Sequence, residues 1–306
     1  MPSPEHDALL ARLLERTSRT FALAIPLLPA PLDRSVTSAY LLFRIADTFE
    51  DATVLWRRER RLAALAELEG LLEEPRADRA AELAARWLDP APTAHEGYLD
   101  LLRHAPEVIA ELLAMPAAVR EVMAGHTRRT ARGMADFVRR SPERGEIELT
   151  DLAELKLYCY VVAGIVGEML TDLFLLEIPP LAADGEGLRA RASAFGEGLQ
   201  LVNILKDSAD DRREGRVFLP AGTDRAEVFA LARRDLERAT EYCRLLQGAG
   251  APRGVTAFAA SPVALARAAL DRVEQHGPGA RLTRPEVLAL HAKVQAALVA
   301  GRPVLG

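Results

Sequence analysis

Apolar residues recur every three or four positions along nearly the whole chain, and alternating runs of β-branched residues are nearly absent. The periodic segments are rich in Ala, Leu, Glu and Arg, which all favour helix. Prolines and glycines lie between these segments, as at Pro26 to Pro31 and at Gly277 to Gly279. The pattern predicts an all-α protein. The predicted helices cover residues 5–16, 32–54, 56–73, 76–87, 103–123, 126–139, 150–175, 185–212, 224–247, 255–276 and 284–300.

The connections between the predicted helices are short, and the composition does not shift along the 306 residues. Hydrophobic residues make up 49% and charged residues 27%, which is ordinary for a globular protein that buries a sizeable core. The chain shows no low-complexity tract. We therefore expect a single domain spanning residues 1–306, built as a helical bundle.

Two of the predicted helices each carry three carboxylates at positions i, i+3 and i+4, which share one helix face. Acidic runs are usually solvated helix faces, but both sets follow segments that look buried, Ala39 to Phe43 and Leu199 to Leu205. Three like charges on one face repel, and a hard divalent cation such as Mg²⁺ would compensate them and bind a diphosphate. The two sets are Asp47, Glu50 and Asp51, and Asp207, Asp210 and Asp211.

The charge and cysteine content exclude several classes of protein. A net charge of -5, without a basic cluster interleaved with aromatic residues, argues against a nucleic-acid binder. Cys159 and Cys243 are too few for a disulfide framework or a zinc site, which favours a reducing cytoplasm. No apolar run reaches the roughly 18 residues of a membrane span, and residues 1–7 do not resemble a signal peptide. Association with a membrane surface stays open.

One predicted helix contains glycines at Gly164 and Gly167, which cost roughly 1 kcal/mol each relative to Ala. Glycine in a helix interior indicates close approach, either of another helix or of an elongated apolar ligand such as an isoprenoid. Tyr158 is a better candidate than Tyr160 to line a cavity, because only Tyr158 shares an apolar helix face. That face is formed by Val162, Ile165 and Met169.

The second acidic helix carries further polar groups. Gln200 and Asn203 place amides upstream of Asp207, where a metal-bound water or a diphosphate oxygen would serve as a hydrogen-bond partner. Gly215 is expected to end this helix, and the extended segment that follows, up to Pro220, is expected to close over the site as a lid.

Taken in order, these motifs resemble the squalene/phytoene synthase family of head-to-head prenyltransferases. The resemblance rests on their order, spacing and helical context together, since each motif alone is weakly specific. The matching segments are Ser18 to Phe21, Arg44 to Asp51, Tyr158 to Gly167, Gln200 to Asp211, Gly215 to Pro220 and, more weakly, Phe258 to Pro262.

The resemblance implies an isoprenoid synthase fold with a central apolar cavity between the two acidic helices. The six carboxylates would hold Mg²⁺ against the diphosphates of two farnesyl diphosphate molecules, and Tyr158 would handle a proton or steady a cation. Arg suits a forked contact with diphosphate and Lys a point charge. The residues implied in substrate binding are Ser18, Arg19, Phe21, Arg44, Gln200, Asn203, Lys206 and Arg216.

The same resemblance implies presqualene diphosphate as the intermediate and, with hydride from NADPH, squalene as the product. Without hydride, a phytoene- or dehydrosqualene-type product follows, and relatives that have lost the aspartates act as assembly or binding proteins. Thr283 stands where reductive members carry a base, and no glycine-rich dinucleotide motif exists. The residues implied in binding NADPH are Arg19, Arg44, Lys206, Arg281 and Arg284. We expect a cytoplasmic protein, in possible peripheral contact with the membrane for product release.

Overall fold

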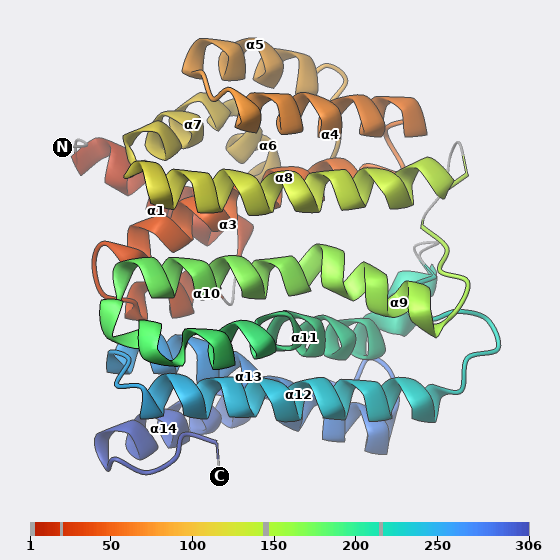
Figure 1. Ribbon diagram of the computed structural model, residues 1–306. Helices are drawn as coiled ribbons and strands as arrows, with labels where there is room; N and C mark the ends of the chain where they lie inside the picture. The colour runs from red at the N-terminus through yellow and green to blue at the C-terminus, as the bar shows by residue number, and fades with distance from the viewer. Residues whose placement is uncertain (1–3, 19–20, 143–146, 214–216, 306) are drawn as a thin grey trace. The chain divides into compact units, whose positions relative to one another are not determined.

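The computed structural model describes residues 4–18, 21–142, 147–213 and 217–305, with the side chains of residues 209–213 left out of the description. Helices make up nearly all of the regular structure in these ranges (Figure 1). The strand-like pairing among them is one isolated parallel bridge between Glu148 and Val217. The predicted all-α fold is confirmed.

The chain divides into two compact units. The N-terminal unit consists of residues 1–26 and 30–146, and the C-terminal unit consists of residues 27–29 and 147–306. Each unit has its own set of buried apolar side chains. The expectation of a single domain over residues 1–306 stays a prediction.

The N-terminal unit packs α3 and α4 against α8, and α1 against α3 and α6. Its interior includes Phe49, whose ring lies 4.9 Å from that of Trp87 and 5.7 Å from that of Trp56. These aromatic contacts hold the C-terminal end of α3 against the segments that follow it. The helices are α1 (Pro4–Thr17), α2 (Phe21–Ala24), η1 (Ile25–Leu27), α3 (Leu32–Glu50), α4 (Arg58–Glu73), α5 (Ala77–Trp87), α6 (Glu96–Arg103), α7 (Ala105–Ala114) and α8 (Ala117–Arg140).

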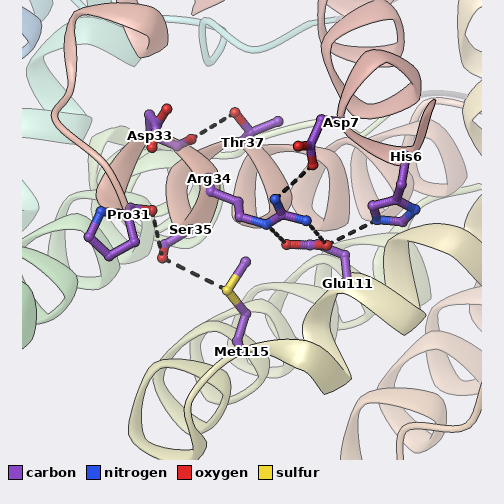
Figure 2. A network of polar contacts seen from close by, with 9 residues as sticks. All are labelled: His6, Asp7, Pro31, Asp33, Arg34, Ser35, Thr37, Glu111 and Met115. Atoms are coloured by element: carbon purple, nitrogen blue, oxygen red, sulfur yellow. Dashed lines mark hydrogen bonds and ion pairs between the residues drawn. The ribbon is translucent and has the colours of Figure 1, made fainter. Parts of the chain in front are cut away.

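A buried carboxylate joins three helices of this unit (Figure 2). Glu111 on α7 accepts two hydrogen bonds from the guanidinium of Arg34 on α3 and contacts His6 Nε2 on α1 at 3.0 Å. Arg34 also donates to Asp7 at 2.7 Å. Its pKa is raised above the usual value, because the hydrogen bond and charge of Glu111 outweigh the burial of the guanidinium. The network fixes α1 and α7 relative to the helix that carries the first acidic motif.

Several predicted boundaries in this unit are wrong. The stretch 103–123 is not one helix, because α7 ends at Ala114 and Pro116 caps the start of α8. Proline has no backbone N–H to continue a helix but fits immediately before the first turn of one. The break predicted between residues 123 and 126 is also wrong, because α8 runs without interruption from Ala117 to Arg140. The short helix α6 was also missed, although His95 caps it by accepting the backbone N–H of Tyr98.

The C-terminal unit is organised around α11, which packs against α10, α12 and α13, while α14 packs on α13 (Figure 1). The predicted helix over residues 150–175 is interrupted by a π turn, η2. The elements are α9 (Leu152–Cys159), η2 (Tyr160–Gly164), α10 (Ile165–Glu177), η3 (Pro179–Asp184), α11 (Gly185–Arg213), α12 (Arg225–Gly248), α13 (Arg253–His276) and α14 (Arg284–Val299).

Glycines in this unit mark close packing of two helices. A Cβ atom added to Gly167 would overlap the carbonyl oxygen of Ala192 on α11, and one added to Gly196 would overlap that of Ala163. Glycine at these positions lets the two backbones approach more closely than any side chain allows. Of the two explanations for the glycines, close approach of a helix is therefore the one seen at Gly167.

One helical stretch, Leu152–Glu177, is long and apolar enough to cross a membrane by length and composition, and its most apolar 18-residue window has a mean hydropathy of 1.8. Within the fold, 56% of its most apolar window is buried. Core helices of soluble proteins show the same combination. Its packing against α11 accounts for its apolar character.

Gly196→Ala should lower the free energy of unfolding by roughly 2–4 kcal/mol, because the new methyl group must displace the backbone of the facing helix. The matched control is Gly70→Ala on α4, where an added Cβ meets nothing within 4 Å. That change should stabilise the protein by roughly 0.5–1 kcal/mol. Urea unfolding followed by circular dichroism measures both. Equal effects of the two substitutions would contradict the close contact.

Candidate functional site

The first acidic motif lies at the C-terminal end of α3, and its three carboxylates differ in exposure. Glu50 is only 4% exposed, and the buried Arg61 donates to its backbone carbonyl. Asp51 is exposed, and the side chain of Asp47 is 29% exposed. Asp51 is thus open to solvent and Asp47, one helical turn before it, is half-buried, whereas Glu50 belongs to the interior.

Arg44 lies one turn before Asp47, and its Nη1 is 3.2 Å from Asp47 Oδ2. The hydroxyl of Tyr40 accepts hydrogen bonds from Arg44 Nε at 3.2 Å and Nη2 at 3.1 Å, and itself donates to the carbonyl of Thr17 at 2.8 Å. Burial opposes the charge of Arg44, but the neighbouring Asp47 and tyrosine oxygens outweigh it and raise the pKa of Arg44. The guanidinium stays protonated in this partly buried position.

Burial raises the pKa of Asp47 from 3.8 to about 6, against the opposing effect of Arg44 and with a further rise from the charge of Asp51. The ionised form is therefore disfavoured in the folded protein. A cation placed between Asp47 and Asp51 would relieve this repulsion, because carboxylate oxygens are the ligands that Mg²⁺ prefers. The residues present fit a magnesium ion.

The short motif before α2 lies in the same unit. Ser18 Oγ accepts the backbone N–H of Phe21 at 2.9 Å, and the ring of Phe21 lies 5.6 Å from that of Tyr40. Ser18 therefore shapes the start of α2, and Phe21 contacts the tyrosine that binds Arg44. Arg19 lies outside the described residues.

The second acidic motif lies near the C-terminal end of α11. Asp207 Oδ2 is 3.3 Å from Lys206 Nζ, and Asp207 Oδ1 is 3.4 Å from Arg281 Nη2. Lys206 also donates to Asn203 Oδ1 at 3.0 Å, and the N–H of Gly279 donates to the Lys206 carbonyl at 2.7 Å. The structure thus brings together Asn203, Lys206, Asp207 and Arg281, with the α13–α14 loop lying over the motif.

The remaining polar residues of this motif are less completely described. Gln200 is half-buried on α11. The side chains of Asp210 and Asp211, and all of Arg216, lie outside the described residues. Among the side chains that are described, no three or more His, Cys, Asp or Glu residues are grouped so as to hold a metal ion.

Tyr158 is 4% exposed and stacks on Phe218, with ring centroids 5.1 Å apart. Phe218 belongs to the extended segment after α11, in which Val217 pairs with Glu148 and Pro220 is buried. The segment expected to act as a lid therefore packs on Tyr158. Tyr160, by contrast, donates to the carboxylate of Glu168 at 3.2 Å.

Two of the residues expected to bind NADPH, Arg281 and Arg284, lie just before and at the start of α14. Arg284 is exposed in the first turn, after Thr283. Thr283 and Glu286 form a capping box, in which Glu286 accepts the Thr283 N–H at 2.7 Å. Hydrogen bonds from Thr283, and then the one from Arg272, lower the pKa of Glu286 to about 2. Thr283, between Arg281 and Arg284, thus serves as the N-cap of α14.

Three aromatic residues near these groups were not predicted from the sequence. Tyr40 and Tyr98 contact Arg44 in the N-terminal unit, and Phe218 contacts Tyr158 in the C-terminal unit. The contact of Tyr40 with Arg44 could have been predicted from the sequence, because Tyr40 precedes Arg44 by one helical turn. Tyr98 and Phe218 come from other segments, so spacing along a helix gives no signal for them.

Comparisons with known proteins identify the family. The family model described as squalene/phytoene synthase matches residues 14–291. The Botryococcus squalene synthase of Botryococcus braunii is 31% identical over 214 residues, covering 68% of this chain and 41% of that protein. Squalene synthase ERG9 of Gibberella zeae is 29% identical over 316 residues, covering 96% of this chain and 63% of that protein.

Solved structures share the fold. A structure described as the complex of TcSQS with the ligand E5700 superposes with a TM-score of 0.76 at 24% identity, covering 95% of this chain and 86% of that one. This likeness agrees with an all-α isoprenoid synthase fold. The chain spans about two fifths to two thirds of the length of the two relatives named above, 41% and 63%.

Asp47→Asn should stabilise the protein at pH 8 by on the order of 1–3 kcal/mol, because a carboxylate whose folded pKa exceeds its unfolded value destabilises the fold when ionised. The gain should shrink as the pH falls through about 6 and vanish only below about pH 3, where both the folded and the unfolded state bind the proton. Urea unfolding between pH 3 and pH 8 measures this. Asp78→Asn is the control, since Arg76 lowers the pKa of Asp78 and no gain is expected there. A loss of stability for Asp47→Asn at pH 8 would contradict the assignment.

Proposed function

The chain belongs to the squalene/phytoene synthase family, and we propose that it is a prenyltransferase that condenses two farnesyl diphosphates head to head to squalene. The intermediate is presqualene diphosphate, and the reaction depends on Mg²⁺ and NADPH. The squalene synthase names of the relatives support this choice of branch. The substrates are prenyl diphosphates, and the apolar product favours peripheral contact of a cytoplasmic protein with the membrane.

The observation that carries the proposal is the juxtaposition of Arg44 with Asp47 on α3. The guanidinium supplies donors for diphosphate oxygens, and Asp47 and Asp51 supply carboxylate oxygens for a cation. On the second motif, Asp207 and the undescribed side chains of Asp210 and Asp211 would do the same. The chemistry that Mg²⁺ supplies when bound is neutralisation of the charge that develops on the leaving diphosphate.

Other residues bind the substrates and handle the proton. Arg19, Arg44, Lys206 and Arg216 bind diphosphate oxygens, and Ser18, Phe21, Gln200 and Asn203 complete the substrate contacts. Departure of one diphosphate leaves an allylic cation, which alkylates the double bond of the second substrate, and loss of a proton closes the cyclopropane. Tyr158 takes this proton or steadies the cation. Its position, stacked on Phe218 and nearly inaccessible to water, supports that role.

Squalene forms when the remaining diphosphate leaves presqualene diphosphate, the resulting cation rearranges, and the final cation accepts a hydride, which NADPH would supply when bound. Arg281 and Arg284 would contact the phosphates of NADPH. Because Arg281 contacts Asp207, the NADPH phosphates would bind close to the second acidic motif. Thr283 favours the alternative, a phytoene- or dehydrosqualene-type product formed without reduction. Its hydroxyl is occupied by the capping box and offers no cation to a phosphate.

Incubation with farnesyl diphosphate, Mg²⁺ and NADPH should give squalene, and omission of NADPH should let presqualene diphosphate accumulate. Product analysis by mass spectrometry distinguishes the two. Asp207→Ala should lower turnover at least roughly a thousandfold, because a ligand of the metal contributes several kcal/mol to transition-state stabilisation. A C30 hydrocarbon formed without NADPH, or a preference for geranylgeranyl diphosphate, would move the assignment to the carotenoid branch. No product from either substrate would favour a binding protein.

Tyr158→Phe should lower kcat far more than it raises KM, since the hydroxyl is used only after diphosphate has left. Tyr160→Phe is the matched control, because its hydroxyl is directed to Glu168, and it should retain near-wild-type kcat. Steady-state kinetics with farnesyl diphosphate measure both variants. A change in KM alone for Tyr158→Phe argues against the proposed role.

A further inference from the structure

The guanidinium of Arg44 is held on more than one side within the N-terminal unit. Its Cζ lies 5.5 Å from the ring centroid of Tyr40 and 5.3 Å from that of Tyr98. Tyr40 is on the same helix and holds two of the guanidinium nitrogens through its hydroxyl. Tyr98 comes from α6 and contacts the guanidinium through its ring. These distances are within the range of cation–π attraction.

Tyr98 is itself fixed by its surroundings. His95 accepts the Tyr98 N–H through Nδ1 at 3.3 Å, and the two rings stack with centroids 4.1 Å apart. The neighbouring Gly97 lies so close to the carbonyl of Arg16 on α1 that an added Cβ would overlap it. Arg16 in turn donates to Asp100 on α6 at 2.5 Å. The first turn of α6 is thus held against α1, with the Tyr98 ring beside α3.

We propose that Tyr98 is a positioning residue that holds the Arg44 guanidinium in place to bind a diphosphate group. This deepens the proposed function and rests on it. Tyr98 acts through Arg44 and does not touch the substrate. Its spacing along the chain does not point to this role, which needs neither a metal nor a hydrogen bond to the ligand.

The geometry explains why Tyr40 alone does not suffice. The Tyr40 hydroxyl binds Nε and Nη2, while Asp47 attracts Nη1. These polar contacts lie at the edges of the guanidinium, and the ion pair draws it toward the carboxylate. The Tyr40 ring, 5.5 Å from Cζ, supplies one cation–π contact, and the Tyr98 ring, which is closer, supplies a second from another helix. The ring of Tyr98 interacts with the cation as a whole and competes with no N–H group. It therefore restrains Arg44 while leaving donors for an incoming phosphate.

The test is the affinity for inorganic diphosphate, measured by isothermal titration calorimetry at fixed Mg²⁺. Tyr98→Leu should weaken binding about 3- to 30-fold, the range expected for loss of one cation–π contact. Tyr98→Phe keeps the ring and should stay within about twofold of wild type. With farnesyl diphosphate, Tyr98→Leu should raise KM by a similar factor. If Phe is as harmful as Leu, or if neither changes the affinity, the proposal is overturned.

Two controls separate positioning from folding. Phe137→Leu removes another buried ring that lies under an arginine, 4.7 Å from Cζ of Arg140, and should leave diphosphate affinity unchanged. Circular dichroism and thermal melting compare its stability with that of Tyr98→Leu. If Tyr98→Leu does not fold, Tyr98→Met fills the same space with a flexible side chain, and the same loss of affinity is expected.

Arg44→Gln, which removes the charge, distinguishes failure of this proposal from failure of the proposed function. If Arg44→Gln leaves diphosphate affinity unchanged, Arg44 does not bind diphosphate and the proposed function loses its main support. If Arg44→Gln weakens binding but Tyr98→Leu does not, only the positioning role is overturned. The double variant should be weakened by less than the product of the two single effects, because the residues act through one contact.

Discussion

A charged pair on a largely buried helix is the constraint on which the N-terminal unit depends. Arg44 and Asp47 lie on α3, whose other faces are covered by apolar side chains such as Leu41, Leu42 and Phe49. Charges so close to a core are costly unless each finds a partner. The partners of Arg44 come from two helices: Asp47 and Tyr40 on α3 itself, and Tyr98 on α6. The Thr17 carbonyl at the end of α1 holds the Tyr40 hydroxyl in turn. The packing of α1 and α6 against α3 thus supplies contacts that stabilise the charge of Arg44.

In both acidic motifs a cation compensates the charge of an aspartate, but the cations come from different parts of the chain. In the first, the cation comes from the same helix, three residues before Asp47. In the second, one cation is adjacent in sequence, Lys206, and the other, Arg281, comes from the loop between α13 and α14. A backbone hydrogen bond from Gly279 to the Lys206 carbonyl ties that loop to α11. Part of the compensation of the second motif thus depends on tertiary structure, because the contact of Arg281 with Asp207 would be lost if this loop moved.

Features set by local chemistry could be predicted from the sequence. Most of the long helices appear close to their predicted bounds, because periodicity, proline and glycine act within a few residues. The exception is α8, which was divided between two predicted helices. The acidic motifs were found for the same reason, since i, i+3 and i+4 spacing is local. The break at Pro116 could have been predicted by the same rule. The exposure of the acidic side chains could not be predicted in this way. The helical pattern groups Glu50 with Asp47 and Asp51, and only the packing of Arg61 and the core shows that Glu50 is buried.

Contacts between distant segments account for what the sequence did not predict. Tyr98 reaches Arg44 only because Gly97 lets α6 approach α1. The apolar composition of α9 and α10 predicts one continuous helix, and the π turn between them is a property of packing. Gly164 lies within this turn, where an added Cβ would be 2.8 Å from Tyr160 Cδ2 and 3.1 Å from Glu197 Oε1 on α11.

The π turn changes how Tyr158 should be understood. A π turn holds one more residue than an α turn, so it rotates the following helix by about 100° relative to a continuous α-helix. A face traced at α-helical spacing from Tyr158 to Ile165 and Met169 is therefore broken at Tyr160–Gly164. Tyr158 instead stacks on Phe218, which follows the second acidic motif in the chain. Within the C-terminal unit, the tyrosine and the segment after α11 form one packed group, so a movement of that segment would change the surroundings of the tyrosine ring.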